Sequence, residues 1–129
     1  MNKLATVTGC LLILLTAGEV HTAAAQKATE IYIPVGQSPG LAGYTQIGTV
    51  TSLDMSEGTL TLTDTLEQVH TARLSDSTSI WLDRSLIKQQ NMVVSVNDIE
   101  EGQRVEVKYY LAPDSTYLAV AEWIKIQVR

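Results

Sequence analysis

Near its C-terminus the chain alternates apolar and polar residues at period two, and this pattern constrains the fold more than any other. The apolar positions are Val105, Val107, Tyr109 and Leu111, and the polar positions are Arg104, Glu106, Lys108 and Tyr110. Successive side chains of a β-strand point to opposite faces, so the pattern predicts a strand with one buried face and one wet face. Turn residues follow in Ala112–Thr116, and Tyr117–Val128 then returns as the second strand of a hairpin.

The returning strand changes its buried face partway along. Its apolar side carries Leu118, Val120, Ile124, Ile126 and Val128. Glu122 interrupts that side, where Ala121 and Trp123 place apolar groups on the other. Such a change predicts a β-bulge or a sharp bend, as closed barrels use. We expect Glu122 to pair with a base, Arg84 or Lys125, because buried acids are usually paired.

Strand patterns separated by turn residues recur from Tyr44 onward. Before the hairpin, they begin near Tyr44, Thr59, Val69, Ser79 and Met92. A capped helical turn is expected at Asn97–Gly102, where Asn97 or Asp98 begins the turn and a glycine ends it. The sequence therefore predicts an all-β fold, a small closed or partly open Greek-key barrel (OB-like) of about five or six strands with one short helical turn. A meander or a small sandwich is the alternative.

The N-terminus has the three parts of a secretory signal. Lys3 supplies a positive charge, an apolar run extends from Leu4 to Ala17, and the small residues Ala23–Ala25 precede the expected cut before Gln26. The apolar run is shorter than the roughly 20 residues that span a bilayer. A lipoprotein signal at Cys10 and an uncleaved anchor are the alternatives. We expect a periplasmic or secreted protein with no stable membrane insertion after cleavage.

Three segments follow from these boundaries. Residues 1–25 are the signal peptide, 26–43 an N-terminal strap rich in proline and glycine, and 44–129 the β-domain. We expect the strap to close one end of the barrel; a lid or an anion-binding nest is the alternative.

Composition limits the partners. Removing 25 of the 129 residues leaves 104, enough for one domain. The net charge stays at −5, because Lys3 and Glu19 of the signal cancel, and the only cysteine, Cys10, is lost. Nucleic-acid binding depends on clustered Lys and Arg, which this acidic chain lacks. We therefore expect no nucleic-acid partner.

The turns and core positions resemble those of a family of exported bacterial domains of unknown function with an OB-like barrel. The matching positions are Gly48, Val50, Leu53, Asp54, Gly58–Leu62, Thr78, Ile80, Asp98, Ile99, Gly102, Val105, Val107, Ala121, Ile124 and Ile126. The resemblance covers residues 45–128 and implies the fold and the exported location. It implies no reaction.

A second, weaker similarity is to periplasmic copper or silver chaperones, which are exported small barrels. They hold a soft ion with a histidine, an M-x-M pair and a tryptophan. This sequence offers His70, Met55 and Met92, but it has no M-x-M pair. Soft-metal binding is therefore an alternative function, and we expect no cofactor.

The candidate binding surface is aromatic. Trp81, with Asp83 and Arg84 beside it, lies opposite the expected buried face of its strand, and Trp123 with Tyr110 would extend it as an exposed patch. Core packing of these rings is the alternative reading. We predict a non-enzymatic exported binding or interaction domain whose partner is an envelope protein or a small ligand.

A small hydrolase is the second alternative. It would use His70 or Glu122 near a serine, with Ser75, Ser77 and Ser79 the nearest in sequence. No serine lies in a nucleophile-elbow motif, so we expect no catalytic residues.

Overall fold

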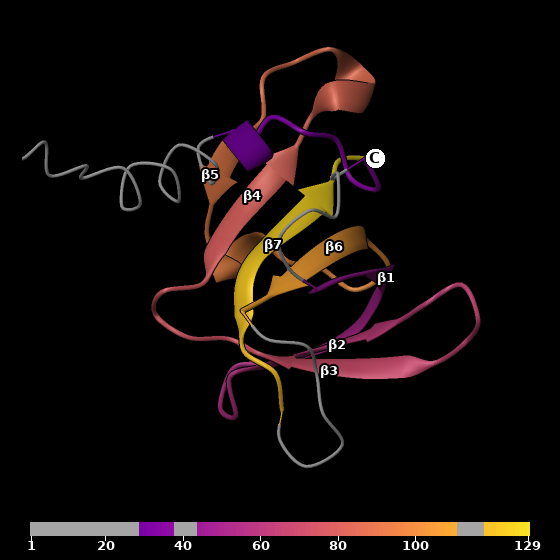
Figure 1. Cartoon of the computed structure of the whole chain (residues 1–129), viewed down its shortest axis with the longest axis vertical. Helices are drawn as coiled ribbons and strands as arrows, with labels where there is room; N and C mark the ends of the chain where they lie inside the picture. The colour runs from indigo at the N-terminus through magenta and orange to yellow at the C-terminus, as the bar shows by residue number, and fades with distance from the viewer. Residues whose placement is uncertain (1–28, 38–43, 111–117) are drawn as a thin grey trace, which may run out of the picture.

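The computed structural model describes residues 29–37, 44–110 and 118–129 (Figure 1). The expected signal peptide, the end of the strap and the turn at 112–116 lie outside this range. Among the described residues, no helix is both long and apolar enough to cross a bilayer.

The domain is built on one mixed sheet of seven strands in the order β3-β2-β1-β6-β7-β4-β5 (Figure 1). The strands are β1 (Tyr44–Asp54), β2 (Thr59–Thr63), β3 (Val69–Arg73), β4 (Ser79–Asp83), β5 (Met92–Val94), β6 (Arg104–Tyr109) and β7 (Ala121–Gln127). Neighbouring strands are antiparallel except β4 and β7, which run parallel.

The all-β prediction is confirmed, but the smaller strand number and the closed barrel are wrong. The sheet has seven strands and is not closed, so β3 and β5 are its edges. Across the opening, Arg73 at the end of β3 makes one isolated parallel bridge to Val120, and its backbone N–H donates to the Ala119 carbonyl over 2.9 Å. β3 therefore touches the chain just before β7 without forming a ladder with β7.

Two 3-10 turns replace the single helical turn that was expected: η1 (Ser85–Ile87) and η2 (Val96–Asp98). The expected cap at Asn97 or Asp98 is wrong by two or three positions, because Ser95 caps η2. Its hydroxyl accepts from the Asn97 N–H over 3.0 Å, and the Asp98 carboxylate accepts from the Ser95 N–H over 2.9 Å. This reciprocal pair is a capping box.

One face of the curved sheet forms the apolar core. Its buried members are Val50, Leu60, Leu62, Ala72, Ile80, Ile99, Val105, Val107, Tyr109, Ala121, Ile124 and Ile126. Val105, Val107 and Tyr109 of β6 all belong to it, which confirms the buried face predicted from their alternation.

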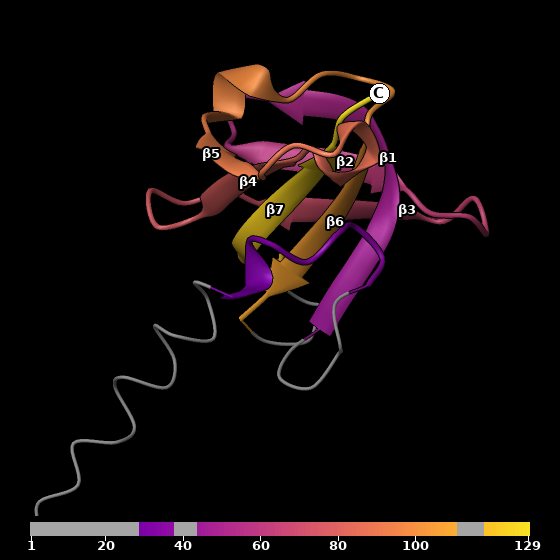
Figure 2. The ribbon, with the colours of Figure 1, turned by 90° about the horizontal axis from the view of Figure 1, so that it is seen from above.

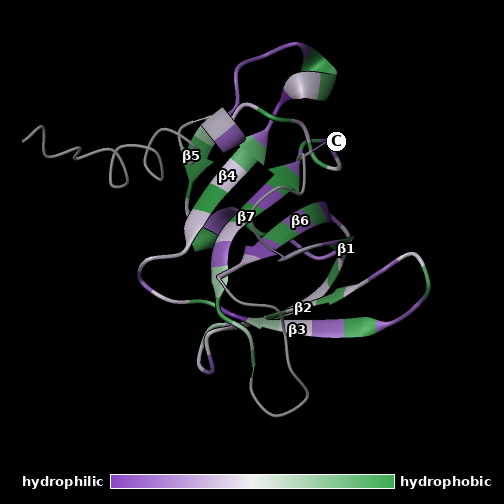
Figure 3. Ribbon diagram, in the orientation of Figure 1, coloured by the Kyte–Doolittle hydropathy of each residue, from purple (hydrophilic) through white to green (hydrophobic). Residues whose placement is uncertain are grey.

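The predicted irregularity at Glu122 is confirmed as a bulge. Lys108 pairs with Trp123 and Tyr109 pairs with Ala121, so Glu122 has no partner across the β6–β7 ladder. The extra residue lets both Ala121 and Trp123 be buried, each fully, on different faces of the sheet. Bands of opposite hydropathy alternate along β6 and β7 (Figure 3).

The second face of β4, β6 and β7 is covered by Thr29–Gln37, the described part of the strap (Figure 2). The prediction that the polar face of β6 is wet holds only at its two ends, where Arg104 and Tyr110 are exposed; at its centre Glu106 is 1% exposed and Lys108 is 6% exposed. An alternating pattern reveals which residues share a face, and here the centre of both faces is buried.

Candidate functional site

The two tryptophans meet beneath the strap. Trp81 of β4 and Trp123 of β7 are stacked with ring centroids 5.3 Å apart, and they are 4% and 0% exposed. The expected exposed aromatic patch is wrong, because the strap covers both rings. Tyr110 is 52% exposed and no ring contact links it to them among the described residues.

A buried lysine lies over this aromatic pair. Lys125 Nζ is 4.7 Å from the Trp123 ring centroid and 5.8 Å from that of Trp81. It donates to the strap carbonyls of Glu30 over 2.7 Å and Ile33 over 2.6 Å. Burial lowers the pKa of Lys125, and the charges of nearby carboxylates only partly offset this. The lysine therefore recognises the backbone of the strap.

The Glu30 carboxylate of the strap is held by two donors from the sheet. Trp123 Nε1 donates to it over 2.8 Å and Lys108 Nζ over 2.7 Å. Lys108 Nζ also lies 3.7 Å from the Glu122 carboxylate, so the base that Glu122 meets is Lys108 and the expected partners, Arg84 and Lys125, are wrong. This corner of the face is a site for one carboxylate carried on a turn of the strap.

Two acids of the sheet bind strap N–H groups. Asp83 Oδ2 accepts from the Val35 N–H over 2.8 Å, and Glu106 Oε2 accepts from the Gly36 N–H over 3.1 Å. Burial by itself raises the pKa of Asp83, but hydrogen bonds from Ser85 and Val35 and the charge of Lys125 outweigh it and lower the pKa below its usual range. Asp83 is therefore an ionised acceptor for the strap.

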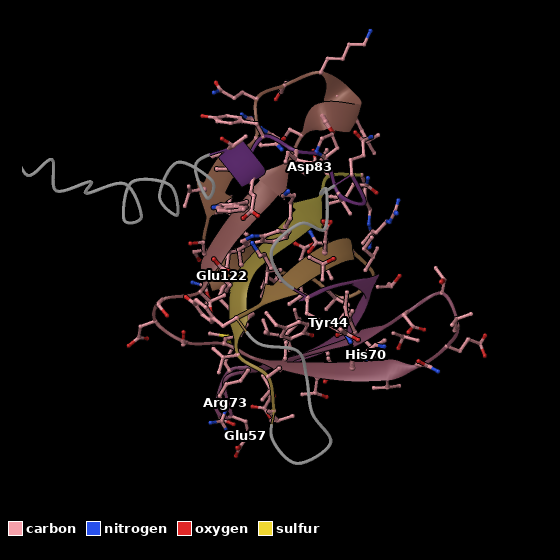
Figure 4. All side chains as sticks on the ribbon, viewed as in Figure 1. Tyr44, Glu57, His70, Arg73, Asp83 and Glu122 are labelled. Atoms are coloured by element: carbon pink, nitrogen blue, oxygen red, sulfur yellow. The ribbon has the colours of Figure 1, made fainter. Side chains whose placement is uncertain are left out.

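These side chains form one constellation, which we call the strap-binding face: Asp83, Glu106, Lys108, Trp123 and Lys125. Every member hydrogen-bonds to the strap. Asp83 and Glu122 lie toward opposite ends of this region (Figure 4). Among the residues expected to form the binding surface, Asp83 and Trp123 belong to the face, and Trp81 packs against it.

Arg84 does not join the strap-binding face. Its guanidinium donates to the Gln90 carbonyl over 2.7 Å and to Gln89 Oε1 over 3.1 Å, which fastens the loop after η1. Sequence reasoning missed Glu30, Glu106, Lys108 and Lys125. The alternation of Glu106, Lys108 and Lys125 with buried apolar residues marks a common face, but the strap that covers this face and carries Glu30 is distant in sequence.

His70 lies elsewhere, in a polar group with Asp64 and Gln46 near Tyr44 (Figure 4). The nearest serines in sequence bond within their own turn, where Ser75 Oγ and Ser77 Oγ are 2.8 Å apart. Within the described ranges no serine hydrogen-bonds to His70, and Glu122 lies by Lys108. The arrangement offers no support for the hydrolase alternative.

The three candidate ligands for a soft metal are dispersed. His70 is on β3 and Met92 on β5, which are opposite edges of the sheet. Met55 lines a separate hollow of about 210 Å³ with Leu74 and Ile80. The described part of the chain also contains no group of three or more His, Cys, Asp or Glu residues suited to a metal ion.

Comparison with family models, with curated proteins and with solved structures finds no match. The resemblances seen in the sequence therefore stay predictions, and function is inferred from the geometry.

Proposed function

We propose that this chain is an exported, non-enzymatic binding domain that recognises a short polypeptide segment folded in turns on its strap-binding face, with the strap as a built-in occupant. One observation carries the proposal. All the buried polar side chains of that face direct a hydrogen bond to the strap, either to its backbone or to the partly buried carboxylate of Glu30.

A segment with only a structural task is held at lower cost by apolar contacts, because buried ion pairs repay their desolvation poorly. This strap uses few apolar contacts: among Thr29–Gln37, only Val35 is a buried hydrophobic residue, at 5% exposure. Directed hydrogen bonds to a peptide backbone and charge-assisted bonds to a carboxylate are the means by which proteins select peptide segments. The face is therefore built to recognise a peptide.

The expected export signal supports a partner outside the cytoplasm, an envelope or extracellular protein with an accessible chain segment. The acidic composition supports a protein partner and not a nucleic acid. An OB-like, partly open barrel remains our proposal for the wider fold, supported by the bridge between Arg73 and Val120.

The test uses the full mature chain and a labelled peptide with the sequence of residues 29–37. Trp81 and Trp123 are the chain's only tryptophans and both lie under the strap, so intrinsic fluorescence reports its release. Glu30→Ala removes the acceptor of Trp123 and Lys108, and we expect a red-shifted emission that the added peptide reverses. Peptide anisotropy should show tighter binding to this variant than to the wild type, whose own strap competes.

Glu57→Ala is the matched control, because it removes an exposed carboxylate with no contact to the strap among the described residues. It should leave emission and peptide binding as in the wild type. If Glu30→Ala keeps its circular dichroism spectrum and still fails to bind the peptide, the strap is a fixed part of the fold and the proposal is wrong. If the alanine variant does not fold, Glu30→Gln, which keeps the side-chain shape, replaces it in the experiment.

A further inference from the structure

One buried oxygen of the strap-binding face has no hydrogen-bond partner in the strap. Glu106 is 1% exposed, and its Oε2 accepts from the Gly36 N–H, yet its Oε1 has no hydrogen-bond partner. Among the described residues it is the one buried side-chain nitrogen or oxygen in that condition. Buried polar atoms are nearly always paired, so this oxygen is an acceptor that a suitably placed donor would satisfy.

Neighbouring groups do not fill this need. Lys125 lowers the energy of the Glu106 charge, but its ammonium donates to the Glu30 and Ile33 carbonyls. The strap itself offers only a backbone N–H here, because the residue beside Glu106 is Gly36. A Cβ on Gly36 would lie 3.3 Å from Arg104 Nη2, and its φ of +83° disfavours other residues. The strap is thus an incomplete ligand of the face that it covers.

We propose that the partner segment has three features, of which the strap has two. It carries a carboxylate and an aliphatic side chain, spaced as Glu30 and Val35 are in the strap. It also carries a hydrogen-bond donor, a hydroxyl or an ammonium group, within the next two positions. That donor reaches Glu106 Oε1, and the partner displaces the strap because it pairs an oxygen that the strap leaves unpaired. This inference rests on the proposed function.

The same geometry explains how the face is kept covered before a partner arrives. An uncovered face would expose a tryptophan pair beside buried charges, which invites unspecific association. The strap prevents this and binds more weakly than a complete ligand.

The experiment compares peptides of residues 29–37 in competition against the labelled parent peptide on the full chain. One set carries Ser or Lys in place of Gly36, and a second set carries them in place of Gln37. A peptide with Gly36→Ala or Gln37→Ala controls for the backbone and steric effect of each change. We expect at least one donor peptide to bind about tenfold more tightly than both its alanine control and the parent.

The gain in peptide affinity should disappear in the Glu106→Gln variant. There an amide nitrogen can take the place of the unpaired oxygen, and an amide nitrogen accepts no hydrogen bond from the peptide. If that variant does not fold, the affinities of the Ser and Lys peptides for the wild-type chain are compared with those of the Ala peptides, and this comparison alone tests the inference. If the parent peptide binds the Glu30→Ala chain but no donor peptide exceeds its alanine control, this inference is overturned and the proposed function stands. If no peptide binds any form of the chain, the proposed function itself fails.

Discussion

His70 Nε2 lies 2.7 Å from Asp64 Oδ2, while its Nδ1 lies 2.9 Å from the Gln46 amide nitrogen. An amide nitrogen only donates, so Nδ1 accepts and the ring proton lies on Nε2, facing the carboxylate. The Gln46 side-chain oxygen accepts from the Tyr109 hydroxyl over 2.6 Å. A hydrogen-bonded chain thus links a turn aspartate to a core tyrosine.

Removing His70 should make the stability of the fold less dependent on pH in the acid range. The His70 hydrogen bond is the main cause that lowers the pKa of Asp64. A carboxyl with a depressed pKa stabilises the fold above its unfolded value, about 3.9, and that contribution is lost as pH falls through the folded pKa. The stability difference between wild type and His70→Ala should therefore shrink as pH falls below about 4 in urea titrations followed by circular dichroism.

Asp54 provides the matched control, because it holds an equivalent turn and its pKa is lowered mainly by the Ser56 hydroxyl, without a histidine. In the double variants, the loss of unfolding free energy from Asp54→Asn should add to that from His70→Ala. The loss from Asp64→Asn should not add to it, because both changes remove the same hydrogen bond. Additivity of all pairs would show that His70 and Asp64 are not coupled.

Tyr109→Phe should reduce the loss of unfolding free energy that the wild type shows as pH rises from about 10 toward 12. Burial, with a smaller effect of Tyr44, raises the pKa of Tyr109 to about 12. The folded state then keeps a proton that the unfolded chain loses near pH 10, so stability falls as pH rises from about 10 toward 12. At pH 7 the variant should cost about 1 kcal/mol for the lost bond to Gln46. Tyr44→Phe, at a site 47% exposed, should keep the alkaline fall; equal profiles for the two variants would contradict the assignment.

The sequence predicts what is local in this fold and misses what depends on distant segments. Alternation correctly predicts that Val105 and Val107 are buried, and the change of face at Glu122 correctly predicts a bulge. The burial of Glu106 depends instead on a strap some 70 positions earlier in the chain, since Gly36 is its contact. No periodicity within a strand contains that information.

The same limit explains the candidate site. Trp81 and Trp123 stand out as large aromatic residues, and the sequence predicts that they share one exposed patch; they do adjoin, with ring centroids 5.3 Å apart, but both are buried. It places them at the surface because the parallel pairing of β4 with β7, and the segment lying over both, join parts of the chain far apart in sequence. Parallel pairs need long crossovers, and short-range patterns do not specify them.

Gly48→Ala should destabilise the β1–β2 pairing. A Cβ at this position would lie 2.6 Å from the Thr63 carbonyl oxygen and 2.7 Å from a Leu62 methyl group, and the first of these is backbone that cannot rotate away. We expect a loss of about 3 kcal/mol, the upper end for overpacking. Gly58→Ala is the comparison: its Cβ has 3.6 Å to its nearest neighbour, so only its φ of +65° is strained. That change should cost about 1 kcal/mol, and a smaller loss for Gly48→Ala than for Gly58→Ala in thermal unfolding would contradict the packing account.

Lys125→Met should release the strap while leaving the sheet intact. The change leaves the Glu30 and Ile33 carbonyls without their donor and removes the positive charge that helps to lower the pKa of Asp83. Breaking one partner of a buried charge cluster costs about 3–5 kcal/mol, so global stability should fall by that order and tryptophan emission should shift to the red. The Asp83 pKa should rise, because its hydrogen bonds must then offset burial without a nearby cation. Lys88→Met is the control: this side chain is exposed and has no hydrogen bond or ion pair to the strap among the described residues, so the change should alter neither the stability nor the tryptophan emission. A Lys125→Met protein with wild-type emission would show that the strap is held without this lysine, by the remaining contacts of Glu30, Val35 and Gly36.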